Sequence, residues 1–186
     1  MEATERGLHL FGTPVGLCGI AWGSGGILAL GLPEASETAL RGRLTRRAPG
    51  AREMAPPAPV AAARDGVLDL LGGTRRTLAE VALDMTGIGD FEQAVYAAAR
   101  AIPPGEIVTY GELAGRVGDR RQARAVGQAL GRNPFVIVVP CHRIMAANGG
   151  TGGFSAHGGV ATKMRLLEIE GARLPGSDAD AQLNLL

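Results

Sequence analysis

Five large apolar residues in a row, residues 135–139 (FVIVV), limit most strongly how this chain can fold. A run without polar interruption has no face for solvent, so it predicts a strand buried on both sides. Pro140 follows the run and cannot donate to a sheet ladder, so it favours the end of the strand at that point. The fold must therefore build a core around this segment, with Cys141 at its edge.

The length of 186 residues allows one domain, or two small lobes that fold as a unit. A hydrophobic content of 46% and a mean hydropathy of +0.11 are typical of a globular protein. No segment reaches the roughly 18 apolar residues of a membrane span, and the charged residues 1–6 do not resemble a signal peptide. We therefore expect no membrane association and a cytoplasmic location.

Only two cysteines are present, Cys18 and Cys141. Two thiols cannot form a disulfide scaffold or a four-sulfur zinc site. The sequence therefore predicts a reducing compartment, no metal and a cysteine kept either for reactivity or for packing.

Residues 1–85 predict a small lobe of strands and helices. A helix is expected over 36–47, with Ser36 as its N-cap and with Leu40 and Leu44 one turn apart. The prolines at 56, 57 and 59 are expected to break the chain before a second helix over 60–71. Strands are expected over residues 8–14, 17–22, 26–32 and 77–83.

Residues 86–173 predict a more helical lobe. Asp90 is expected to cap a helix over 91–101, and a last helix over 160–170 should stop at Gly171. Two short helices, over 111–117 and 122–132, flank a turn at 118–119, which is a helix-turn-helix pattern. Residues 174–186 are expected to form a loose tail.

The basic residues are concentrated in the second half of the chain. The whole chain has a net charge of only +1, but residues 100–173 hold ten basic and five acidic side chains. An anionic partner would bind there, although a solvated surface is the simpler explanation of the charge alone.

Cys141 and His142 are adjacent, which is a pattern for nucleophilic catalysis. An imidazole that takes the thiol proton, and is itself oriented by a carboxylate, activates a cysteine. Adjacent side chains of an extended strand point in opposite directions, so this pair needs a turn or a bridging water. The alternative is a buried structural cysteine, the commoner fate of such a residue.

Several motifs, in order, resemble the O6-alkylguanine-DNA alkyltransferases, a family of suicide DNA-repair proteins. Residues 140–144 (PCHRI) are similar to the active-site signature of that family, and Asn133-Pro134 precedes it as in the family. Residues 104–110 (PGEIVTY) resemble the start of its helix-turn-helix, residues 123–127 (ARAVG) its recognition helix, and residues 166–171 (LLEIEG) its C-terminal helix. The likeness covers about residues 82–173.

The resemblance implies an α+β fold. Residues 1–85 would form a small ribonuclease H-like lobe, residues 86–173 a winged-helix-type lobe with the helix-turn-helix and the active site, and residues 174–186 a flexible tail. It implies stoichiometric transfer of an alkyl group, mainly methyl, from O6-alkylguanine in DNA to a cysteine, with O4-methylthymine as a candidate second substrate. The protein would be a monomer without cofactor, and it would bind double-stranded DNA from the minor groove.

The resemblance also implies roles for single residues. Cys141 would accept the alkyl group, and His142 would act through a water as its base, oriented by Glu170. Tyr110 would help to rotate the nucleotide out of the duplex and would protonate the guanine. Asn133 would hold the turn before the active-site segment.

Further residues would contact the DNA and the flipped base. Arg124 would fill the gap in the base stack, on a helix whose small residues allow close approach to the minor groove. The remaining DNA contacts would come from Ala123, Ala125, Gly127, Arg120 and Arg121. The substrate contacts would come from Ser155, Met145 and Phe154. Each of these residues taken alone also has an ordinary structural role.

The sequence departs from the family pattern near the substrate loop. Phe154 stands where many members have tyrosine, and two residues, Ala156 and His157, are extra.

Two other classes stay open: a helix-turn-helix regulator, and an alkyltransferase-like protein that binds lesions without transfer. The first would need a dimerisation or effector segment that we do not find, and proteins of the second class lack the acceptor thiol. A Cys-His hydrolase is a weaker third alternative.

Overall fold

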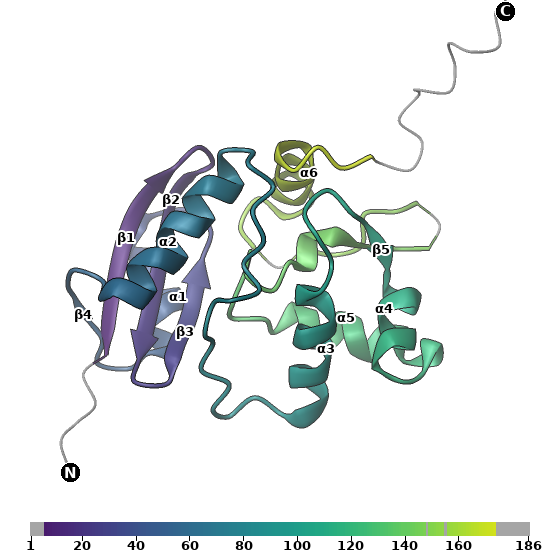
Figure 1. Cartoon of the computed structure of the whole chain (residues 1–186), viewed down its shortest axis with the longest axis horizontal. Coiled ribbons are helices and arrows are strands. Elements are labelled where there is room, and N and C mark those ends of the chain that lie inside the picture. Colours follow the sequence, from purple (N-terminus) through teal and green to yellow (C-terminus); the bar gives the residue numbers. More distant parts are fainter. Residues whose placement is uncertain (1–5, 148, 155, 174–186) are drawn as a thin grey trace, which may run out of the picture.

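The computed structural model describes residues 6–147, 149–154 and 156–173. It is a mixed α+β structure, with a sheet and two helices at one end and a group of helices at the other (Figure 1). Within these residues, no helix combines the length and the apolar character needed to cross a membrane.

The sheet is formed by the first part of the chain. Strands β1 (Gly7–Thr13), β2 (Gly16–Gly23) and β3 (Gly26–Gly31) make an antiparallel meander, and the short β4 (Arg52–Glu53) adds to β1 in parallel. The strand order is therefore β3-β2-β1-β4. The three long strands confirm the predicted ones to within one residue.

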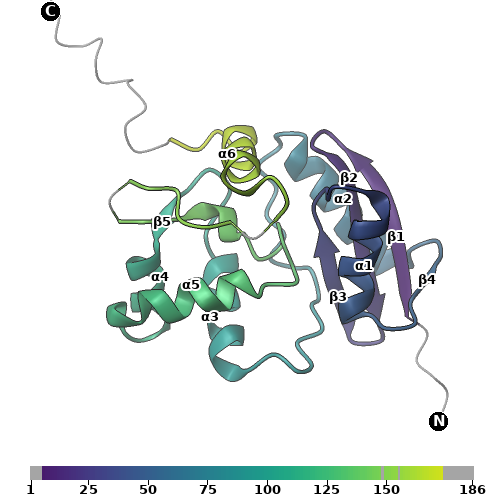
Figure 2. The same ribbon diagram turned by 180° about the vertical axis from the view of Figure 1, so that it is seen from behind.

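Two helices cover opposite faces of this sheet (Figures 1 and 2). Helix α1 (Glu37–Arg47) begins where predicted, because the Ser36 hydroxyl accepts a hydrogen bond from Ala39 N at 3.1 Å. Helix α2 (Ala58–Leu71) begins two residues earlier than predicted. Pro59 was expected to break the chain, but proline is tolerated in the first turn of a helix, where its missing N–H has no partner to lose.

The prediction of a strand over 77–83 is wrong. The segment is an irregular loop with a single bridge between Leu83 and Ile27. Its carbonyls do not form a ladder, because the Arg100 guanidinium binds those of residues 78, 79 and 81 at 3.2, 2.7 and 2.8 Å. Leu78 and Val81 bury their side chains from this loop.

The second part is mostly helical. It contains α3 (Asp90–Arg100), β5 (Val108–Thr109), α4 (Tyr110–Val117), η1 (Arg120–Gln122), α5 (Ala123–Gly131), η2 (Cys141–Arg143), β6 (Ile144–Met145) and α6 (Gly159–Ile169). Helices α4 and α5, with η1 between them, confirm the helix-turn-helix, and a capping box of Thr109 and Glu112 begins α4. Helix α6 ends as predicted, with Gly171 in the left-handed region at φ 65°.

One of these helix starts differs from the prediction. The N-cap of α3 is Gly89, so Asp90 is the first helical residue and no side chain caps the helix. Asp90 still stabilises the helix as an acid in its first turn. The helix predicted over 122–132 is confirmed as α5 to within one residue at each end. The 3₁₀ helix η1 precedes it, and Asp119 accepts a hydrogen bond from Arg121 N at 2.9 Å at its start.

The segment 135–139 is buried as predicted, but it is not a regular strand. Ile137 has a φ of 75°, and Val139 N donates to Phe135 O at 2.8 Å, so the chain turns on itself here. A short apolar run predicts burial well but does not distinguish a strand from a buried turn.

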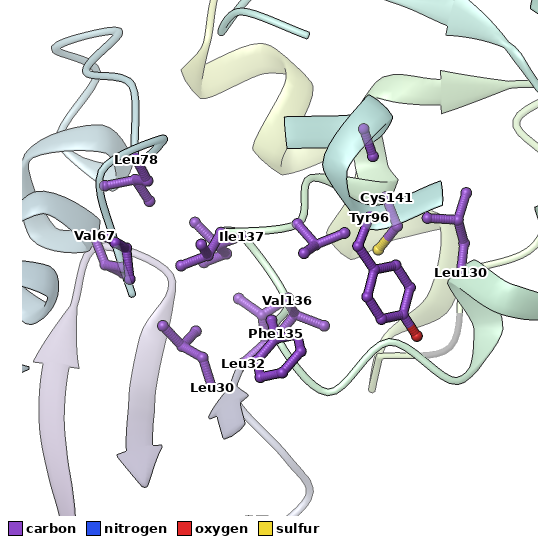
Figure 3. Packing of buried hydrophobic residues seen from close by; sticks show 14 of the residues in the cluster. Leu30, Leu32, Val67, Leu78, Tyr96, Leu130, Phe135, Val136, Ile137 and Cys141 are labelled. Atoms are coloured by element: carbon purple, nitrogen blue, oxygen red, sulfur yellow. The ribbon is translucent and has the colours of Figure 1, made fainter. Parts of the chain in front are cut away.

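This buried segment joins the two parts of the molecule. Leu30 N, at the edge of the sheet, donates to Pro134 O at 2.9 Å, and Leu30 bridges to Phe135. Figure 3 shows Phe135, Val136 and Ile137 between the first part and Tyr96. One apolar cluster therefore runs from the sheet to the segment that carries Cys141.

Candidate active site

Cys141 lies in a tight turn rather than at the end of a strand. Pro140 precedes the 3₁₀-helix η2, which is closed by a hydrogen bond from Arg143 N to Pro140 O at 2.9 Å. Helix η2 packs against α6, and Cys141, His142 and Arg143 are all buried. In such a turn, unlike in an extended strand, adjacent side chains are not directed to opposite faces.

The carboxylate of Glu170 links the turn to the end of α6. Glu170 Oε1 lies 2.9 Å from His142 Nε2 and accepts from Arg143 Nη2 at 2.7 Å, and Oε2 accepts from Arg143 Nε at 2.9 Å. Gly105 N donates to Oε2 at 3.2 Å. A buried carboxylate with this many donors is held in one orientation.

These contacts determine the protonation states of Glu170 and His142. Burial would raise the pKa of Glu170, but the hydrogen bonds and charges of His142 and Arg143 outweigh it and lower the pKa to about 2. Burial lowers the pKa of His142 despite the opposing Glu170. The imidazole is therefore neutral at pH 7, its Nε2–H donates to the carboxylate, and Nδ1 carries the lone pair. Among the described side chains, nothing hydrogen-bonds to Nδ1.

Cys141 rests as a thiol. Burial raises its pKa, although a hydrogen bond with Asn133 and the positive charges of Lys163 and Arg43 act in the opposite direction. Burial also raises the pKa of the other cysteine, Cys18, to about 11. Reactivity at Cys141 therefore depends on a base that removes the proton, not on a standing thiolate.

Asn133 holds the approach to this turn. It is buried, its Nδ2 donates to Val139 O at 2.9 Å, and its Oδ1 accepts from Phe135 N at 2.8 Å. Both bonds brace the irregular segment before Cys141. The hydrogen bond that lowers the pKa of the thiol places the same side chain beside the sulfur.

An apolar cavity of about 820 Å³ lies between the helix-turn-helix and the Cys141 turn. Burial raises the pKa of Tyr110, so its hydroxyl stays protonated and can donate a hydrogen bond. The predicted site residues that line the cavity are Tyr110, Ala123, Arg124, Gly127, Cys141 and Phe154.

Other predicted residues lie outside this cavity. Arg120 and Arg121 are exposed in η1, and Arg121 pairs with Asp119 at 2.9 Å. Ala125 is half-buried on α5, and Met145 is buried in β6, next to Ala146 and Ala147, which do line the cavity. Ser155 lies outside the described residues.

Two residues of the site were not singled out from the sequence, Arg143 and Lys163. The buried Lys163 is the chain's single lysine, and its Nζ donates to Ile144 O and Thr151 O, both at 2.5 Å. Burial lowers the pKa of Lys163 to about 8, against the opposing effect of Cys141. Its spacing from Leu166 and Leu167 places it on the buried face of α6, which is a signal the sequence does hold.

No group of three or more side chains suited to a metal ion occurs within the described parts of the chain.

The fold and the site together define a class of protein. It is an α+β protein in which a helix-turn-helix forms one wall of a cavity, and a cysteine backed by a buried His–Glu pair lines the same cavity.

The chain is similar to several known proteins. A family model described as 6-O-methylguanine DNA methyltransferase, DNA binding domain, matches residues 90–172. A methylated-DNA–protein-cysteine methyltransferase of Mycobacterium tuberculosis is 47% identical over 96 residues, which cover 52% of this chain and 56% of that relative. The match thus spans little more than half the length of that relative.

Two further comparisons extend over most of the chain. A methylated-DNA–protein-cysteine methyltransferase of Methanothermobacter thermautotrophicus is 33% identical over 158 residues, covering 85% of this chain and 81% of the relative. A crystal structure of Mycobacterium tuberculosis OGT in complex with DNA is 34% identical and covers 91% of this chain and 95% of that one, with a TM-score of 0.68. The chain belongs to the methylated-DNA–protein-cysteine methyltransferase family.

Proposed function

We propose that this protein repairs DNA by moving an alkyl group, mainly methyl, from the O6 atom of guanine to Cys141 Sγ. The observation that carries the proposal is the buried Cys141, which shares a cavity with the helix-turn-helix and has the His142–Glu170 pair beside it. The carbon–oxygen bond of the lesion breaks as the sulfur–carbon bond forms. Guanine gains one proton in place of the alkyl group, which balances the proton that the Cys141 thiol loses. The thioether has no easy route to hydrolysis, so each molecule acts once.

His142 is proposed to take the thiol proton. Its neutral imidazole directs Nε2–H to Glu170, which leaves Nδ1 as the acceptor, and a bridging water would connect Nδ1 to Sγ. Tyr110 is proposed to donate a proton to the departing guanine, a role for which its raised pKa suits it. Asn133 would hold the turn that presents the sulfur.

The DNA is proposed to approach along α5 from its minor groove, with the damaged nucleotide rotated into the cavity. Arg124 is exposed on the first turn of α5 and also lines the cavity, which suits a side chain that replaces an extruded base. Ala123, Ala125 and Gly127 keep the face of the helix small. Arg120 and Arg121 would contact phosphates.

Other parts of the proposal concern the base and the wider molecule. Phe154 would pack on the base, Ser155 would contact its oxygen, and the main chain near Met145 would bind its exocyclic amine. The sheet lobe would be ribonuclease H-like and the second lobe winged-helix-type, with the boundary at residues 85–86. We further propose a monomer in the cytoplasm, without a cofactor, that also accepts O4-methylthymine.

Intact-mass analysis tests the proposal. Protein mixed with an excess of duplex DNA that carries O6-methylguanine should gain one methyl group, mapped to Cys141, and should repair about one lesion per molecule. Cys141→Ser should bind the duplex but gain no mass. Repair of several lesions per molecule without an adduct would contradict the suicide mechanism, and binding without any transfer would favour the regulator or the lesion-binding protein.

A further inference from the structure

The loop that follows α2 carries a residue in an unusual backbone conformation. Arg75 has a φ of 54°, in the left-handed region that residues other than glycine seldom adopt. The side chain leaves its own lobe, and its Nε donates to the main-chain oxygen of Glu170 at 3.1 Å, across 95 residues of sequence. A conformation of this kind persists only where surrounding contacts hold it.

The contact lies at the end of α6. Glu170 is the C-cap of that helix, and the last carbonyls of a helix lack partners within it. A guanidinium there satisfies a carbonyl and also complements the negative end of the helix dipole. The neighbouring Gly73 also lies close to α6, since a Cβ on it would be 3.7 Å from Ile169 O.

Gly105 completes this contact from the helical part. A Cβ at Gly105 would overlap Arg75 Nη2 and would lie 2.9 Å from Glu170 O, so only glycine allows the three groups to pack together. The N–H of Gly105 donates to Glu170 Oε2 at 3.2 Å. Glu170 is thus held at its main chain by Arg75 and at its carboxylate by Gly105, Arg143 and His142.

We propose that Arg75 is a positioning residue for alkyl transfer, which fixes the main chain of Glu170 and thereby the alignment of His142 with Cys141. The inference rests on the proposed function for its link to transfer, but its geometry concerns only the thiol and its base. The first lobe would then take part in catalysis without touching the substrate. Charged groups that act on Cys141 and His142 are Glu170, Arg143, Lys163 and Arg43.

The test compares Arg75→Ala, Arg75→Gly and Arg75→Lys, with Arg76→Ala as the control. Arg76 is the next residue of the same loop, and its guanidinium pairs with Asp69 and Glu80 on the surface. Two rates are measured across pH: alkylation of Cys141 by iodoacetamide, with Cys18 as the internal reference, and single-turnover methyl transfer from O6-methylguanine base. Thermal unfolding is recorded for each variant.

Arg75→Ala should lower both rates at neutral pH by about tenfold, short of the roughly hundredfold that a displacement of 1 Å can cost. Its pH profile should also change shape, because the base is misaligned. Arg75→Gly should show the same loss with a melting temperature near that of the wild type, since glycine relieves the backbone strain. Arg75→Lys should recover part of the rate, because an ammonium can donate to the same carbonyl.

Two results would overturn the inference. One is a pH profile for Arg75→Ala and Arg75→Gly that matches Arg76→Ala. The other is a loss of rate in Arg75→Ala that accompanies a lower melting temperature, with no loss of rate in Arg75→Gly. That result would show that the contact of Arg75 only stabilises the fold. If the wild type transfers no methyl group, the proposed function fails, while the iodoacetamide profile still decides the role of Arg75.

Discussion

At the scale of single residues, the site is a set of buried charges that depend on one another. Glu170, Arg143 and Lys163 are each less than 5% exposed. Removing one member of such a set leaves another charge buried without its partner, which is strongly destabilising. Conservative substitutions are therefore the informative ones here.

Glu170→Gln should weaken His142 as a base. The carboxylate raises the pKa of His142 through a hydrogen bond and its charge, so an amide lowers that pKa further and reduces the driving force for taking the thiol proton. In the wild type, transfer should be constant through neutral pH and fall in acid as the imidazole becomes charged. In Glu170→Gln the plateau should be lower by a factor of about 10–100, within the usual range for general bases, and the acid limb should move to lower pH.

Stopped-flow or quenched single-turnover rates against pH measure both effects. Glu168→Gln is the matched control, because Glu168 is exposed on the same helix and pairs only with Arg165 among the described ion pairs. An unchanged plateau and acid limb in Glu170→Gln would exclude the proposed relay.

Arg124→Ala should separate base flipping from the chemical step. Without the guanidinium, extrusion of the nucleotide should cost about 1–3 kcal/mol more, or roughly ten- to hundredfold in rate. The free O6-methylguanine base needs no extrusion, so its reaction with Cys141 should be almost unaffected. The measurement is the saturating single-turnover rate on duplex DNA and on the free base. An equal loss on both substrates would mean damage to the fold, and no loss on saturated duplex would reduce Arg124 to a phosphate contact.

At the scale of elements, local signals were sufficient for some parts and not for others. Helix α1 has a serine cap and a regular apolar period, so its bounds follow from the sequence. Segment 77–83 is richer in apolar residues than α1, but the guanidinium of Arg100 binds its carbonyls and no ladder forms. The contacts of Arg75, Arg143 and Lys163 likewise join residues that no local pattern relates. Cys141 could be proposed from the sequence because its motif is local, whereas the groups that hold the motif come from distant segments.

The helix-turn-helix should bind DNA with a marked dependence on salt and little dependence on sequence. Each phosphate contact makes the slope of log K against log salt concentration more negative by about 0.9, so a few contacts give a slope of roughly −2 to −5. Arg120→Ala and Arg121→Ala should each reduce the slope by about 1 if they bind phosphates, while Arg64→Ala, in α2, should not. Fluorescence anisotropy over a range of salt concentrations measures this. A flat salt dependence, or a strong preference for one sequence, would favour the regulator.

At the scale of the whole molecule, the two lobes share one core. Phe135 is fully buried between Leu30 of the sheet and Tyr96 of α3, whose ring it meets edge-on at 6.2 Å. The two parts contact each other through this apolar cluster and through the hydrogen bond from Arg75 to the main-chain oxygen of Glu170. We therefore expect the two parts to unfold together, although we predicted a boundary between two lobes near residue 85.

The two lobes hold separate probes for this expectation. Trp22 is the chain's single tryptophan and lies in β2, and Cys18 is buried in the same strand, whereas Cys141 reports on the second lobe. In urea, the transition of Trp22 fluorescence and the exposure of both thiols to pulse labelling should have one midpoint.

Phe135→Ala should lower the free energy of unfolding by about 3–5 kcal/mol for all three probes. The deciding control is Leu44→Ala: Leu44 is a fully buried residue of α1, and it packs in the apolar cluster on the face of the sheet away from the shared core. If the molecule is one cooperative unit, this remote change must shift the midpoint of Cys141 labelling as much as that of Trp22. A shift confined to Trp22 and Cys18 would show that the lobes unfold independently.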